Sequence, residues 1–97
     1  MDLQNIDNLI HSRARLAIMA ALISAEEVDF NFFREKLNLT DGNLASHLQK
    51  LENAGYIRTK KTFFERRPRT IYTITKTGKT AFANYVNAIE KIIKVIE

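Results

Sequence analysis

The chain has 97 residues, no cysteine, and 15 Lys and Arg residues against 11 Asp and Glu residues. This length allows one domain, and we expect a single unit over residues 1–97. The absence of cysteine excludes disulfides, thiolate metal ligands and cysteine nucleophiles. No apolar run reaches the length of about 18 residues that a membrane-spanning helix needs. Because residues 1–7 carry acids where a secretion signal carries cations, we expect a cytoplasmic protein.

Positive charge is concentrated in residues 57–69. This segment has six cations and one acid, Glu65, so its charge is +5, whereas the whole chain is only +4. The cations are Arg58, Lys60, Lys61, Arg66, Arg67 and Arg69. A cationic stripe on a nearly neutral body is typical of proteins that bind a polyanion. A solvated hairpin that its charge keeps soluble would show the same pattern.

Apolar residues near the start of the chain recur with helical spacing. The spacing predicts a helix over residues 12–24, with Ser12 or Asp7 as its cap. The apolar face of this helix is expected to hold Leu16, Met19, Ala20 and Ile23.

The next segment predicts a short strand and a short helix. Val28–Phe30 alternates in polarity, as a strand of a few residues does. Asn31 suits the N-cap of a helix over residues 32–37, which is expected to end in a turn at residues 38–39. Thr40 is then a second candidate N-cap.

Residues 41–53 predict an amphipathic helix with two different faces. Leu44, Leu48 and Leu51 fall on one stripe, which is expected to face the core. The opposite face is polar and carries Gly42, Asn43, Ser46, Gln49, Lys50 and Asn53. His47 lies at the boundary between the two faces.

After this helix the pattern changes to an alternation with a period of two. Strands are predicted over residues 57–63 and 70–74, joined by a basic loop over residues 65–69. An isolated hairpin is only marginally stable, so this one is expected to pack against the helices. The residues expected to make that contact are Ile57, Tyr72 and Ile74.

Thr75 is predicted to cap a last helix over residues 76–97. Its apolar stripe continues for about six turns, further than a domain of this size can cover. A stripe that outruns its own domain usually packs against a partner helix, which predicts a C-terminal dimerisation helix. The residues expected at the dimer interface are Phe82, Tyr85, Ile89, Ile92, Ile93 and Ile96.

The order helix, strand, helix, turn, helix, basic hairpin, helix resembles a winged helix-turn-helix. The sequence is similar over essentially its whole length to the small winged-helix transcriptional regulators related to the MarR and ArsR groups. The resemblance rests on Arg15-Leu16, Ile18, Leu22, residues 40–57, residues 68–70 and residues 72–79. It implies an α+β fold, mostly α, with a three-helix core, a two-stranded β wing and a long C-terminal helix.

The resemblance also implies a homodimer that binds double-stranded DNA. The helix over residues 41–53 would enter the major groove, and the basic wing would contact the flanking minor groove or phosphates. The DNA-binding residues that it implies are Thr40, Gly42, Asn43, Ser46, His47, Gln49, Lys50, Lys60, Arg66, Arg67 and Arg69. The chain differs from metal-responding relatives because it has no cysteine ligands.

The sequence contains no catalytic constellation. Its two histidines, His11 and His47, are far apart and lack partner ligands, and its three glycines form no phosphate-binding loop. We therefore expect no enzyme, no metal and no cofactor, and the sequence identifies no effector ligand. Two other functions stay open: a winged-helix module that docks onto a larger protein complex, and an architectural DNA binder without sequence preference.

Overall fold

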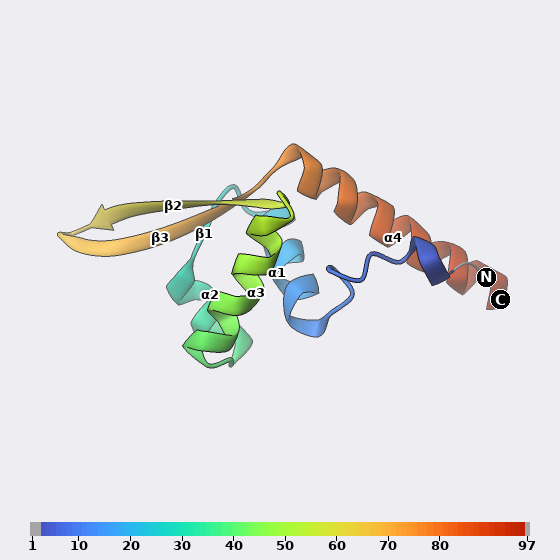
Figure 1. Ribbon diagram of the computed structural model, residues 1–97, viewed down its shortest axis with the longest axis horizontal. Helices are drawn as coiled ribbons and strands as arrows, with labels where there is room; N and C mark the ends of the chain where they lie inside the picture. Colours follow the sequence, from blue (N-terminus) through green and yellow to red (C-terminus); the bar gives the residue numbers. More distant parts are fainter. Residues whose placement is uncertain (1–2, 97) are drawn as a thin grey trace.

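The computed structural model describes residues 3–96, which form four α-helices and a small antiparallel sheet (Figure 1). The elements are η1 (Leu3–Asn5), α1 (Arg13–Ser24), β1 (Val28–Asp29), α2 (Phe30–Leu37), α3 (Asp41–Asn53), β2 (Ile57–Phe64), β3 (Arg67–Ile74) and α4 (Lys76–Ile96). This is the predicted α+β winged helix, mostly helical. The expectations for Met1, Asp2 and Glu97 lie outside the described residues.

Local capping determines where the helices begin. Ser12 Oγ accepts the backbone N–H of Arg15 at 3.3 Å, which confirms Ser12 as the cap of α1. Thr40 Oγ1 likewise accepts the N–H of Asn43 at 3.1 Å and caps α3. The prediction of Asn31 as a cap is wrong. The cap of α2 is Asp29, whose carboxylate accepts the N–H of Phe32 at 2.8 Å, so this helix begins two residues earlier than predicted.

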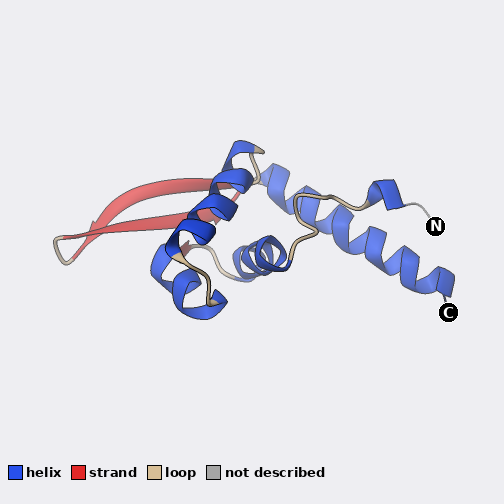
Figure 2. Ribbon diagram, turned by 60° about the horizontal axis from the view of Figure 1, so that its bottom comes forward, coloured by secondary structure: helices blue, strands red, loops and turns tan. Residues whose placement is uncertain are grey.

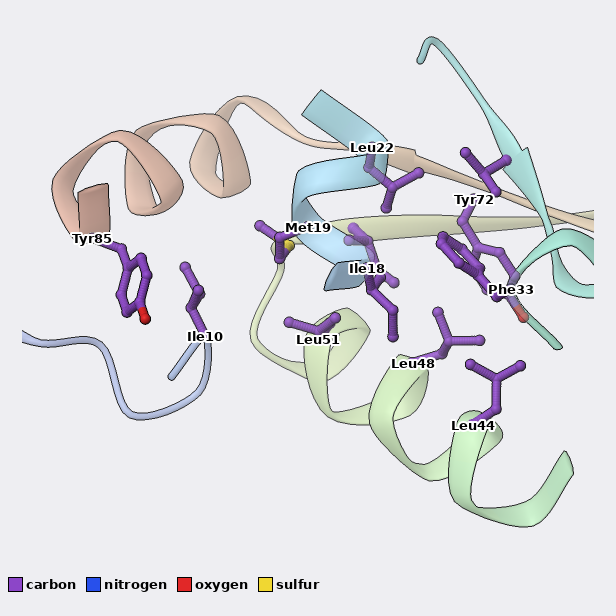
Figure 3. Packing of buried hydrophobic residues seen from close by; sticks show 12 residues of the cluster. Ile10, Ile18, Met19, Leu22, Phe33, Leu44, Leu48, Leu51, Tyr72 and Tyr85 are labelled. Atoms are coloured by element: carbon purple, nitrogen blue, oxygen red, sulfur yellow. The ribbon is translucent and has the colours of Figure 1, made fainter. Parts of the chain in front are cut away.

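The core forms where α3 packs against α1 and the base of the sheet. Leu44, Leu48 and Leu51 of α3 are buried and point into this core, as predicted (Figure 3). They meet Phe33 of α2 and Tyr72 of β3 in one hydrophobic cluster. The opposite side of α3 is therefore left to the solvent.

The predicted face of α1 is partly wrong. Met19 is buried as expected, but Ala20 and Ile23 are exposed. The buried face instead combines Met19 with Ile18 and Leu22. Because α1 is apolar on nearly all sides, its helical spacing is compatible with either of two buried faces. Its packing against α3 and β3 determines which of the two is buried.

The wing hairpin is longer than predicted. β2 and β3 pair continuously from Ile57–Ile74 to Phe64–Arg67, so the loop predicted over residues 65–69 contracts to a two-residue turn. The turn residues, Glu65 and Arg66, have φ of 50° and 67°, which matches the strand twist as type I′ turns do. Residues 67–69, Pro68 included, belong to β3 at a point where β1 no longer pairs with it, so the missing proline N–H is tolerated.

A third strand anchors the base of the wing. The sheet order is β1-β3-β2, with Val28 paired to Tyr72 and Asp29 paired to Ile71. Ile57 and Tyr72 are buried and Ile74 packs against the core, which confirms the predicted contact between hairpin and helices. The outer half of the hairpin projects beyond the helices as a free ribbon (Figure 2).

α4 extends away from the core on the side opposite the wing, which gives the molecule its length of 53 Å (Figure 1). Thr75 caps it as predicted, because its Oγ1 accepts the N–H of Gly78 at 2.9 Å. Tyr85 is only 6% exposed and belongs to the core of its own chain, where its hydroxyl lies 2.9 Å from Nδ1 of His11. The side chain of Ile96, expected at the dimer interface, lies outside the described part of α4.

Candidate nucleic-acid interface

One exposed helix face carries the polar residues that the sequence singled out. Because α3 buries its leucines, its other side presents a row of exposed polar residues to solvent: Gly42, Asn43, Ser46, Gln49, Lys50 and Asn53. Gln49 Nε2 donates to Asn53 Oδ1 at 2.8 Å, which orders the C-terminal part of the row. This row has the hydrogen-bonding groups and the free access that base recognition requires.

The N-terminus of α3 is open to solvent. Thr40 is exposed, and its hydroxyl caps the helix there. A Cβ atom added at Gly42 would meet no protein atom within 4 Å, so the fold does not require glycine at this position. Arg34 of α2 lies 3.6 Å from Asp41 and offsets the one acid in the first turn of α3.

His47 is held by an arginine of α1. Arg15 donates from Nη1 to Nδ1 of His47 at 2.8 Å and from Nε to the carbonyl of Leu9 at 2.5 Å. A guanidinium has no acceptor, so Nδ1 must accept, and the histidine is neutral with its proton on Nε2. Arg15 thus fixes α3 against α1 and adds a cation beside the polar row. The sequence did not indicate this contact, because the two residues are 32 positions apart.

The environment of His47 makes the free energy of unfolding depend on pH. Burial lowers the pKa of His47 from its ordinary value of 6.5, and the charges of Arg15 and Lys50 lower it further. As the pH falls below that value, the unfolded chain binds a proton that the folded chain does not. The stabilisation is therefore complete above about pH 6.5 and is lost as the pH falls through the folded-state pKa.

We expect His47→Gln to reduce this acid destabilisation while keeping an acceptor for Arg15. Urea unfolding of the wild type and the variant at about pH 7.5 and about pH 5.5 measures the effect. His11→Gln is the matched control, because His11 is exposed and contacts Tyr85 of α4 rather than Arg15. Equal pH dependence in the wild type and in His47→Gln would contradict this assignment.

The wing cations differ in their surroundings. Arg66 and Arg67 are exposed at the tip of the hairpin. Arg69, predicted in a loop at the tip, instead lies within β3, where its Nε contacts Asp29 Oδ2 at 3.2 Å and its guanidinium lies over the ring of Phe64. Its charge is therefore already partly compensated within the protein, unlike those of the tip residues.

Strand alternation separates the neighbouring lysines of β2. Lys61 lines a groove of about 630 Å³ between α3 and the wing, together with Gln49, Glu52 and Thr70. Lys60, the predicted DNA contact, follows the opposite alternation and lies on the other face of the sheet. Lys61 and Glu52 were not among the site residues predicted from the sequence. Lys61 is on the same strand face as Ile57, because side chains alternate with a period of two. Glu52 is three residues after Gln49 and therefore next to it on the helix surface.

Two other kinds of site, a metal centre and a membrane-spanning helix, are absent from residues 3–96. Among residues 3–96, no group of three or more His, Cys, Asp or Glu side chains is arranged to hold a metal ion. Within the same part of the chain, no helix has the length and apolar character needed to span a bilayer.

Comparison with known proteins agrees with this geometry. The family model of the winged helix DNA-binding domain matches residues 14–93. An uncharacterized protein of Methanocaldococcus jannaschii is 46% identical over 89 residues, which cover 92% of this chain and 97% of that protein.

Solved structures show the same fold. The transcriptional regulator homologue protein from Pyrococcus horikoshii OT3 superposes with a TM-score of 0.86 at 30% identity, covering 94% of this chain and 90% of that one. An ArsR family transcriptional regulator has a TM-score of 0.66 at 20% identity and covers 95% of this chain and 90% of its own. The second similarity, at this identity, concerns the fold alone.

Proposed function

The chain belongs to the family of winged helix DNA-binding domains, and we propose that it regulates transcription by binding specific duplex DNA sequences as a homodimer. The observation that carries this proposal is the exposed polar row of α3, which lies next to the groove lined by Lys61 and the cationic wing. An α-helix fits the major groove, where each base pair presents a distinct pattern of donors and acceptors. We further propose that the protein acts in the cytoplasm and that residues 1–97 form one domain.

Within this complex, the residues of α3 have different proposed roles. Asn43 and Gln49 carry amides, which can bond both edge atoms of an adenine, and Ser46 can donate to or accept from a base. Lys50 reaches a guanine or a phosphate. Thr40, Gly42 and the first N–H groups of the helix bind a phosphate, and His47 donates from Nε2 to the same backbone.

The wing provides the second set of proposed contacts. Arg66 and Arg67 reach the flanking minor groove or its phosphates, because both are exposed at the tip. Lys60 and Arg69 add positive charge behind the tip. We expect Arg69 to contribute less, since Asp29 already compensates part of its charge.

Replacing a base-reading residue is expected to relax the sequence preference. Asn43→Ala or Gln49→Ala should cost about 1–3 kcal/mol of binding free energy and relax the preference at one base position. The measurement is selection of duplexes from a random pool by the wild type and each variant, followed by titration of the selected duplex. Asn87→Ala, which removes the same amide from an exposed position on α4, is the matched control.

A wild-type protein that binds the random pool without enriching any sequence would contradict specific recognition and identify a non-specific binder. If it binds no duplex, the interaction-module alternative replaces the proposal.

The C-terminal part of α4 is the proposed dimer contact. Ile93 and Val95 are 50% and 65% exposed, while Phe82, Ile89 and Ile92 are half-buried along the same helix. Exposed aliphatic side chains on a helix that leaves its own core are typical of a helix that pairs with a second copy. Tyr85 would support this helix from inside the protomer.

Disrupting that surface is expected to produce monomers. Ile93→Lys should shift the sedimentation coefficient at micromolar concentration from that of a dimer to that of a monomer, because the interface would bury an unpaired charge. Asn87→Lys places the same charge on the polar stripe of α4, about 120° around the helix from Ile93, and should remain dimeric. A monomeric wild type would contradict the assignment.

A further inference from the structure

The outer end of the wing exposes apolar side chains that the core does not use. Phe63 and Phe64, the last residues of β2, are 73% and 60% exposed. Pro68 is exposed directly opposite Phe63 in the strand register. Exposing a large apolar ring to water at the end of a free ribbon is unfavourable, so these side chains are candidates for contact with a partner.

The two rings lie on different faces of the hairpin. Side chains alternate along a strand, and directly opposed residues share a face. Phe63 and Pro68 therefore continue the face of Lys61 and Thr70, which lines the groove beside α3. Phe64 lies on the other face, under the guanidinium of Arg69. By this alternation the ring of Phe63 is on the side of α3, whereas the ring of Phe64 is not. Pro68, opposite Phe63, also borders the hollow lined by Asp29, Phe64 and Arg69.

The surroundings of this apolar pair are cationic. Lys61 precedes it on the same face, and Arg66 lies in the turn that follows, next to the single acid Glu65. Arg67 is also at the tip but pairs with Phe64, so it belongs to the other face of the hairpin. An apolar protein surface that covered this pair would leave the neighbouring charges of Lys61 and Arg66 desolvated and without partners. A polyanion that also offers an apolar surface fits better, and stacked base pairs within a phosphate-lined groove provide both.

We propose that Phe63, backed by Pro68, is an apolar wedge that enters the DNA minor groove beside the half-site and partly separates two stacked base pairs. This inference rests on the proposed function and adds how the wing engages DNA. Arg66 and Arg67 bind the phosphates on either side of the opened step. The bound duplex bends toward its major groove, and sites with a flexible TA or CA/TG step at this position are preferred.

The test compares Phe63→Ala with Phe64→Ala on the duplex that the wild type selects from a random pool. Both remove an exposed phenylalanine ring, but from opposite faces. Phe63→Ala is expected to lower affinity about tenfold, which is about 1.4 kcal/mol. Gel shifts with circularly permuted probes should show that the Phe63→Ala complex has lost most of the DNA bend. 2-Aminopurine placed at the base step that Phe63 is proposed to open should also no longer become more fluorescent on binding. Phe64→Ala should stay within about twofold of wild type, and Phe63→Leu should retain the bend.

The salt dependence distinguishes a wedge from a phosphate contact. Phe63→Ala should leave the slope of log affinity against log salt concentration unchanged, because no cation is removed. The wedge is overturned if Phe63→Ala and Phe64→Ala bind and bend DNA alike, if the wild-type complex shows neither bending nor unstacking, or if Phe63→Ala alters only sedimentation. The proposed function fails in a different way. If the wild type selects no sequence from the pool, specific recognition is overturned. If it binds no duplex at all, both the proposed function and the wedge are overturned.

Discussion

Raising the salt concentration from about 50 to about 200 mM is expected to weaken DNA binding by the wild-type protein by about 10³–10⁵-fold. Two copies, each contributing one α3 and one wing, would neutralise about 6–10 phosphates, and each neutralised phosphate releases a condensed counterion. Titration of the selected duplex at several salt concentrations measures this slope. The expected steepness follows from the exposed cations of the wing rather than from the modest net charge of the chain.

Arg67→Ala should reduce that slope by about one for each wing and weaken binding to all sequences alike. Lys91→Ala removes the same charge from an exposed position on α4 and should leave the slope unchanged. An Arg67→Ala protein with wild-type affinity and slope would argue against a role of the wing in DNA binding.

The second large effect concerns folding. A Cβ atom at Gly78 would lie 2.1 Å from the carbonyl oxygen of Tyr56 and 2.9 Å from Cγ1 of Ile74. That carbonyl already accepts from the N–H of Thr75 at 3.0 Å and from its hydroxyl at 3.1 Å, so the backbone cannot yield easily. We expect Gly78→Ala to lower the free energy of unfolding by about 3 kcal/mol. The melting temperature should fall by about 10–25 °C, as measured by circular dichroism.

Gly42→Ala provides the matched control for this prediction. A Cβ atom at Gly42 meets nothing within 4 Å, so its stability should change by less than about 1 kcal/mol. Equal melting temperatures for the two alanine variants would show that the junction between α3, β2 and α4 tolerates a methyl group and would contradict the packing argument.

The elements that the sequence predicted correctly are those specified by short-range chemistry. Ser12, Thr40 and Thr75 each cap a helix with a hydroxyl that reaches a backbone N–H three residues on. The leucine stripe of α3 depends only on helical spacing, so its direction and the exposure of its polar face could both be predicted. These local rules predicted the order of the elements, and the resemblance to winged-helix regulators then implied the fold.

The features that sequence reasoning missed depend on contacts between distant residues. Arg15 meets His47 across 32 positions, and Tyr56 donates to Asp7 across 49, a hydrogen bond that raises the pKa of Tyr56 to about 12. The pairing of Arg69 with Asp29 likewise requires β1 to lie beside β3. No local pattern indicates such pairs. The short turn was missed for another reason. Glycine or asparagine normally indicates a turn of this kind, and here its two residues are Glu65 and Arg66.

That turn has a consequence for how the wing behaves before it meets a partner. Left-handed backbone conformations cost a residue other than glycine about 1–2 kcal/mol each, and the last strand pairs next to Glu65 and Arg66 have no core beneath them. The ribbon should therefore fray from its apex inward while its base, held by Ile57, stays closed. An apex that opens and re-forms readily can adjust to grooves of different width, so adaptability at one end of the hairpin coexists with rigidity at the other.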